Sequence, residues 1–114
     1  MSYLNEVMLL GNLGENPVIL KEEDNGKFVR LSIATSKKYK TPEGKVEQTN
    51  PEWHTVFLGN SQGKNAAAFL KKGDKVLVLG ELKTHQWTDP TTEQTKTATA
   101  VYGREWRLIF SKKE

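Results

Sequence analysis

Short apolar runs, interrupted by glycine and separated by polar turns, recur along most of this 114-residue chain. The clearest run, 28–35, has Val, Leu and Ile at alternate positions, and a period of two is typical of a half-buried strand. Gly11 and Gly80 interrupt two other runs, which indicates a bulge or a sharp bend in each. The chain is therefore predicted to be mainly β, with strands at 5–13, 17–21, 28–35, 52–58, 75–82, 95–102 and 105–110.

One segment in the middle of the chain has the composition of a helix instead. Residues 66–70 are good helix formers, lysines at 71 and 72 occupy the predicted last turn, and Gly73 follows the predicted end. The segment lies between the third and fourth main strands, 52–58 and 75–82, if the short piece 17–21 is not counted. Short bent strands around one helix favour an all-β fold, a five-stranded Greek-key barrel of the OB-fold type with long β-hairpin loops. An open sandwich is the alternative, but it gives no reason for the helix.

Two long polar segments connect the predicted strands. Residues 36–50 contain a proline and a glycine and predict either a long hairpin loop or a flexible β-ribbon, and residues 87–94 form a second polar loop. Loops of this length in a compact domain are usually functional or disordered. A shorter turn is predicted at 24–26. No linker divides the chain, so we expect one OB-fold domain over residues 1–110 and a short basic end over 111–114.

The residue counts argue against a catalytic or metal-binding protein. The chain has no cysteine, which excludes a disulfide scaffold, a thiolate metal site and a cysteine nucleophile. It has only two histidines, so we expect no zinc site, no other metal and no cofactor. The acidic run 22–24 is interpreted as a solvated turn, and Ser32 and Ser36 have no base near them in the sequence. We expect no enzyme and no small-molecule substrate; a small nuclease is the catalytic alternative.

The hydropathy of the chain argues against a membrane protein. No apolar stretch approaches the roughly 20 residues that a membrane-spanning helix needs. The first ten residues lack the basic region of a secretory signal. We therefore expect a cytoplasmic protein without a membrane partner.

Basic residues gather near aromatic residues in the two polar loops. The net charge is +3, from 17 Lys and Arg against 14 Asp and Glu. Tyr39 lies among three lysines of the first loop, Trp87 opens the second, and Trp53 begins a strand. A base stacked on such a ring contributes about 1–3 kcal/mol whatever the nucleotide sequence, and lysines neutralise phosphates. We predict that these three rings stack on the bases of a flexible polynucleotide rather than pack in a core.

Three other residues receive simpler interpretations. Trp106 in the last predicted strand is expected to pack or to contact another subunit. His54 beside Trp53 is expected to be a packed or interface histidine, and His85 is interpreted as exposed polar surface.

Motifs along nearly the whole chain, from about residue 3 to 110, resemble the bacterial single-stranded-DNA-binding proteins that form homotetramers. Their order and spacing make the resemblance specific. It implies sequence-nonspecific binding and protection of single-stranded DNA during replication, recombination and repair, in a cytoplasmic, nucleoid-associated homotetramer. The motifs are VMLLGNLGENP (7–17), SIATS (32–36), EWH (52–54), FLKKGDKV (69–76), GELKT (80–84) and WTD (87–89).

The resemblance also assigns roles to individual positions. Trp53 and Trp87 match stacking tryptophans of the family, and Tyr39 stands where the family has a third. The stacking phenylalanine of the family falls at Phe57 or Leu58, because this strand is one residue shorter. His54 matches a subunit-interface histidine. The predicted phosphate contacts, from the loop composition and the resemblance together, are Lys37, Lys38, Lys40, Lys64, Lys72, Lys83 and Lys96.

The chain departs from the family pattern in two places. The family continues into a Gly/Pro/Gln-rich tail with an acidic tip, whereas this chain stops at residue 114, so recruitment of repair enzymes through such a tail is not expected. Thr55, His85 and Gln86 stand where arginine or lysine is common, which predicts weaker or more salt-sensitive binding. A dimeric primosomal replication protein, or a barrel that binds RNA or an acidic protein surface, remains the alternative.

Overall fold

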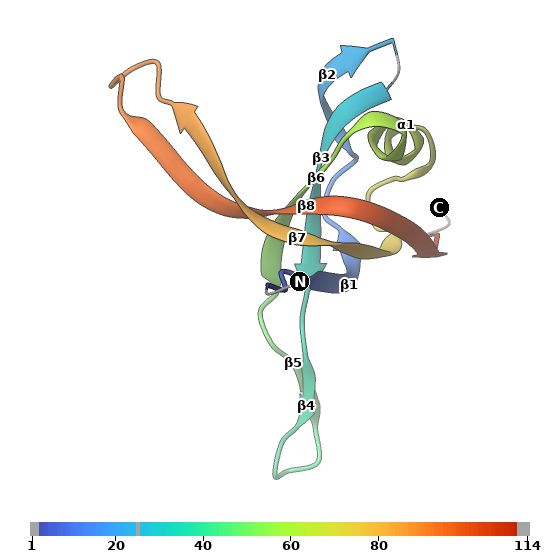
Figure 1. Cartoon of the computed structure of the whole chain (residues 1–114). Coiled ribbons are helices and arrows are strands. Elements are labelled where there is room, and N and C mark those ends of the chain that lie inside the picture. The colour runs from blue at the N-terminus through green and yellow to red at the C-terminus, as the bar shows by residue number, and fades with distance from the viewer. Residues whose placement is uncertain (1–2, 25, 112–114) are drawn as a thin grey trace.

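The computed structural model describes residues 3–24 and 26–111, and most of them lie in strands (Figure 1). The elements are, in chain order, β1 (Val7–Leu13), β2 (Val18–Glu23), β3 (Gly26–Thr35), β4 (Lys38–Lys40), β5 (Val46–Gln48), β6 (Glu52–Leu58), α1 (Asn60–Phe69), β7 (Lys75–Thr88) and β8 (Thr95–Phe110). The predicted all-β class is confirmed. The helix lies between β6 and β7 rather than between a third and a fourth strand, because β2 and the β4–β5 ribbon add strands before it.

The strands form a curled sheet in the order β1-β7-β8-β6-β3-β2, and β1 also pairs with β3. This closing contact is short, since it joins only Asn12 to Ala34 and Leu13 to Ile33. Strands β1, β7, β8, β6 and β3 therefore close into the predicted five-stranded OB-fold barrel, and β2 extends the sheet beyond β3. The closure rules out the open sandwich.

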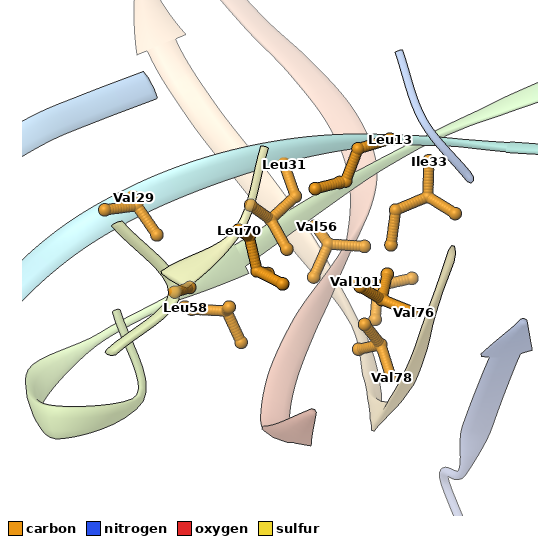
Figure 2. Close-up of a cluster of buried hydrophobic side chains, with 11 residues drawn as sticks. Leu13, Val29, Leu31, Ile33, Val56, Leu58, Leu70, Val76, Val78 and Val101 are labelled. Carbon is orange, nitrogen blue, oxygen red and sulfur yellow. The ribbon is translucent and has the colours of Figure 1, made fainter. Parts of the chain in front are cut away.

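The core of the barrel confirms the period of two in β3. Val29, Leu31 and Ile33 are fully buried, and Figure 2 shows them pointing toward side chains from the opposite strands. Leu70, just after α1, also enters this cluster, so the helix end covers one end of the barrel. The buried cluster consists of Leu13, Val29, Leu31, Ile33, Val56, Leu58, Ala66, Leu70, Val76, Val78 and Val101.

Strand lengths differ from the prediction in the second half of the chain. β7 continues past Leu82 to Thr88, and β8 is one strand where the sequence predicted two. The two strands pair from Lys75 opposite Phe110 to Thr88 opposite Thr95 and project as a long ribbon (Figure 1). Polar residues remain extended here because the partner strand satisfies their backbone hydrogen bonds.

The first polar segment is a ribbon as well. β4 and β5 pair from Lys38 opposite Gln48 to Lys40 opposite Val46, which supports the β-ribbon interpretation of residues 36–50. Of the predicted turn at 24–26, residue 25 lies outside the described residues and Gly26 begins β3. Residues 112–114 of the predicted basic end also lie outside them.

The predicted end of the helix was wrong by one turn. α1 ends at Phe69, so Lys71 and Lys72 follow the helix and do not lie in its last turn. The reason is tertiary: Leu70 takes an extended conformation and is buried in the core. Gly73 then adopts φ 92°, a value that favours glycine, and turns the chain into β7. Within the described residues, no helix is long and apolar enough to span a membrane.

The two strand glycines have different roles. The register between β7 and β8 shifts between Leu79 and Gly80, so the predicted bulge at Gly80 is confirmed. The β1–β7 register runs without a shift through Gly11. Gly11 instead allows β1 to approach β3, because a Cβ there would clash with the carbonyl of Ala34.

Replacing Gly63 in α1 by alanine is expected to destabilise the protein, although alanine is the better helix former by about 1 kcal/mol. The reason is that a Cβ at this position would clash with the carbonyl oxygen of Lys27 on β3. We expect Gly63→Ala to lower the free energy of unfolding by roughly 1–3 kcal/mol, as overpacking does in other cores. Denaturant unfolding measures this, with Asn65→Ala on the exposed side of α1 as the matched control. An increase in stability for Gly63→Ala would contradict the packing of α1 on β3.

Candidate nucleic-acid interface

The outer face of the barrel centres on strand β6. Val56 and Leu58 point into the core, so Trp53, Thr55 and Phe57 alternate onto the outer side. This register separates the two candidates for the stacking phenylalanine position: Leu58 is fully buried in the core, and Phe57 belongs to the outer face. The sequence could not decide this, because both residues are apolar.

Four rings from three strands form a continuous ladder on this face. Phe28 of β3 stacks on Phe57 with ring centroids 5.4 Å apart and planes 6° apart. Phe57 contacts His85 of β7 at 5.0 Å, and His85 stacks on Trp87 at 5.6 Å with planes 26° apart. The ladder therefore runs from the barrel onto the β7–β8 ribbon. We refer to Phe28, Phe57, His85 and Trp87 as the ring ladder.

A cavity lies beside the ring ladder and adds a cation and hydroxyl groups to it. Its volume is about 290 Å³, and it opens between β3, β6, β7 and β8. Tyr102 of β8 tilts against Phe57 at 5.4 Å, and the Lys83 ammonium lies 5.0 Å from the Tyr102 ring centroid. The residues that line the cavity are Arg30, Thr55, Phe57, His85, Trp87, Ala98, Thr99 and Ala100.

Trp53 lies at the other end of β6 with 59% of its surface exposed. Its ring lies against the backbone of Gly14, where a Cβ would clash with the indole. The Gly14 N–H donates to the Ser32 carbonyl at 2.9 Å, which fixes this turn on β3. Gly14 therefore allows the indole to rest on the turn with a large part of the ring exposed to solvent.

The rings predicted to stack on bases differ in their exposure and in the part of the fold that carries them. Trp53 and Trp87, which is 43% exposed, lie on the outer face of the same sheet, whereas Phe57 is only 6% exposed because neighbouring rings cover it. Tyr39 lies on the separate β4–β5 ribbon, exposed, with its hydroxyl donating to Glu47 at 2.9 Å. In Figure 1 this ribbon points downward, while the β7–β8 ribbon extends to the upper left.

The predicted lysines are spread over the molecule, and all are exposed. Lys83 and Lys96 lie on the β7–β8 ribbon, and the Lys96 ammonium is held 3.2 Å from a carboxylate oxygen of Asp89. A backbone hydrogen bond from Thr91 and the contact with Lys96 hold the pKa of Asp89 below its usual value, so this carboxylate stays ionised. The other predicted lysines lie at or near the β4–β5 ribbon, on α1 or in the turn before β7: Lys37, Lys38, Lys40, Lys64 and Lys72.

The two histidines differ in their surroundings. His54 on β6 is half-buried, and its Nε2 lies 2.8 Å from the Thr35 hydroxyl. Its interface role remains a prediction. His85 was interpreted as exposed polar surface, which is wrong, because the structure places it within the ring ladder. Trp106 packs against the core and donates to the Gln62 carbonyl at 3.0 Å, as the packing interpretation expected.

Sequence reasoning missed several residues of this face, above all Phe28, His85 and Tyr102. The signal for His85 was present: had the strand been extended past Leu82, alternation would have placed His85 and Trp87 on one side. Phe28 and Tyr102 are recognisable only from the pairing of β3 and β8 with β6. Within residues 3–24 and 26–111, no cluster of three His, Asp or Glu side chains is arranged to hold a metal.

The barrel and its exposed rings place the protein in the OB-fold class. Comparison with known proteins is more specific: the sequence model described as the single-strand binding protein family matches residues 4–109. The chain belongs to the single-strand binding protein family. It is 31% identical over 114 residues to single-stranded DNA-binding protein 1 of Xylella fastidiosa, covering 100% of this chain and 83% of that protein.

Two solved structures share the fold. The crystal structure of a deletion mutant of the single-stranded DNA binding protein from Thermus aquaticus superimposes with a TM-score of 0.72 at 24% identity. The match covers 93% of this chain and 50% of that one, so this chain spans half the length of that structure. The Plasmodium falciparum SSB in complex with ssDNA gives a TM-score of 0.71 at 25% identity, with 98% of both chains covered.

Proposed function

We propose that this protein binds single-stranded DNA without sequence preference and protects it during replication, recombination and repair. The observation that carries the proposal is the face on which Trp53 and the ring ladder lie, with Lys83 and Arg30 beside it. Residues 1–110 act as one DNA-binding domain in the cytoplasm, at the nucleoid. The function is binding rather than catalysis.

In the proposed mechanism, aromatic rings bind the bases and lysines bind the phosphates. Trp53 and Trp87 offer open ring faces to bases, and Tyr39 offers a third on the β4–β5 ribbon. Phe57 supports the binding face indirectly, because its covered ring packs against His85 and Tyr102 and holds them in place. The exposed lysines neutralise phosphates and release counterions. A strand held by its bases in this way cannot pair with its complement.

Titration with a thymidine oligonucleotide tests the proposed function. Tryptophan emission should be quenched, and the observed affinity should fall steeply as salt rises, with a log–log slope of roughly −0.7 per phosphate contact. Matched RNA and duplex DNA serve as competitors, because equal competition by RNA would favour the RNA-binding alternative. Unchanged emission and no binding at low salt would refute the proposal.

Asp89→Asn is expected to strengthen DNA binding, because it removes a charge that holds Lys96 and repels phosphates. Asparagine can still accept the Thr91 N–H, so the turn is preserved. We expect a gain of roughly two- to fivefold at low salt, the size of one exposed charge contact, and no gain at high salt. The control is Glu93→Gln in the same turn, which removes the same charge without freeing a lysine. A gain no larger than that of the control would show that Lys96 does not contact DNA.

We also propose that the protein assembles as a homotetramer, with β1 in a subunit contact. The Val7–Leu10 part of β1 pairs with β7 on one side, while β3 meets β1 only at Asn12 and Leu13. Met8 and Leu10 expose 71% and 54% of their surfaces on this strand. An unpaired edge with apolar side chains suits strand pairing with a second copy. Sedimentation distinguishes this tetramer from the dimer of the primosomal alternative.

A further inference from the structure

His85 occupies the middle of the ring ladder, where a stacking surface and a titratable group coincide. Its ring centroid is 5.0 Å from that of Phe57 and 5.6 Å from that of Trp87. Its Nδ1 lies 3.5 Å from the hydroxyl of Tyr102, a long contact. The side chain is half-buried and lines the cavity beside the ladder, so a bound strand that stacks on Trp87 would reach it.

Two cations belong to the surroundings of His85. Arg30 of β3 lines the same cavity, and Lys83 of β7 lies over the Tyr102 ring. On β6 the facing residues are Thr55 and Phe57, which carry no charge, and on β8 it is Tyr102, which presents its hydroxyl. None of the side chains that line the cavity is acidic, so the cavity itself offers His85 no anionic partner.

Glu15 and Asp89, two carboxylates of this part of the protein, are already paired with the cations Arg30 and Lys96. Glu15 lies 3.8 Å from the Arg30 guanidinium and accepts from the Ser32 hydroxyl at 3.3 Å. Asp89 holds Lys96, whose position pairs with Trp87 across the ribbon. A phosphate of bound DNA would thus supply a counter-charge for an imidazolium at this position.

We propose that His85 is a further DNA-contact residue, stacking in its neutral form and also pairing with a phosphate in its protonated form. The inference rests on the proposed function. An ordinary histidine changes its charge between about pH 5 and pH 8, and charge-assisted hydrogen bonds to phosphate are stronger than neutral ones. Because a phosphate beside His85 favours the charged form of the ring, we expect the affinity to rise as the pH falls through this range.

The test measures the affinity for a thymidine oligonucleotide at about pH 6 and about pH 8, where thymine does not titrate, at constant ionic strength. For the native chain we expect binding roughly tenfold tighter at the lower pH, the worth of one charged hydrogen bond. His85→Phe keeps an aromatic ring but has no group that can become positively charged, so its affinity should not rise as the pH falls. His85→Arg should bind tightly at both pH values and show no gain.

His54→Gln is the matched control, because His54 is the other of the two histidines in the chain. This variant should keep the full pH gain, and far-UV circular dichroism confirms that each variant is folded. A gain that survives in His85→Phe, or that is absent from the native chain, would overturn the role of His85. Absence of binding by the native chain at either pH would instead refute the proposed function, so the two failures are distinguishable.

Discussion

Replacing both Trp53 and Trp87 by alanine is expected to weaken binding of a thymidine oligonucleotide by roughly 30-fold to 10⁴-fold. Each indole that stacks on a base contributes about 1–3 kcal/mol, and two are removed. Both side chains lie at the surface, with 59% of Trp53 and 43% of Trp87 exposed, so their loss should lower the free energy of unfolding much less than the loss of a core residue would. Equilibrium titration at low salt measures the affinity, and denaturant unfolding checks the fold.

Trp106→Phe is the control for this pair. Trp106 packs against the core and is engaged with Gln62, so its replacement should leave DNA affinity and most of the fluorescence quenching unchanged. The double variant should lose the quenching, because only Trp106 then emits. An affinity within threefold of the native value for the double variant would mean that the two exposed indoles do not stack on DNA.

Introducing acidic residues at Met8 and Leu10 should dissociate the proposed tetramer and thereby weaken binding to long DNA. Both positions point outward on β1, opposite Leu79 and Leu77 of β7, so the apolar strip spans two strands. Carboxylates facing their own copies across a symmetric contact repel each other, and their desolvation is costly. We expect Met8→Glu/Leu10→Glu to sediment as a smaller species.

The affinity of this variant for long oligonucleotides should fall by roughly 10²- to 10⁴-fold, because barrels that are no longer linked lose their effective concentration on one strand. Affinity for a short oligonucleotide that fills a single barrel should change little. Phe69→Glu on α1 is the control, since Phe69 is similarly exposed at 66%. An unchanged molar mass for the β1 variant would place the subunit contact elsewhere.

The parts of the fold that were predictable are those that local pattern determines. Alternation in β3 identified the buried positions correctly, and Gly80 correctly marked a bulge. The extension of β7 to Thr88 was missed because residues 83–88 are polar and resemble a loop, and only pairing with β8 makes them a strand. The helix end was misplaced because Leu70 leaves the helix to enter the core, a tertiary effect that overrides propensity.

In the candidate site, too, some residues could be predicted from the local sequence and others only from the pairing of the strands. Trp53 and Trp87, which the sequence assigned to base stacking rather than to the core, do lie at the surface. The burial of Phe57 depends on rings from three other strands, and no spacing along the chain reveals them. Residues on one sheet face can be predicted only once the register is known, because a shift by one position exchanges the faces.

The most direct test of the account is fluorine NMR of the protein labelled with fluorotryptophan, recorded with and without a thymidine oligonucleotide. The chain has three tryptophans, and they occupy two exposed positions on the outer face and one packed position at the core. We expect the resonances of Trp53 and Trp87 to shift on binding and the resonance of Trp106 to stay in place. DNA binding that leaves the Trp53 and Trp87 resonances unmoved would contradict this expectation.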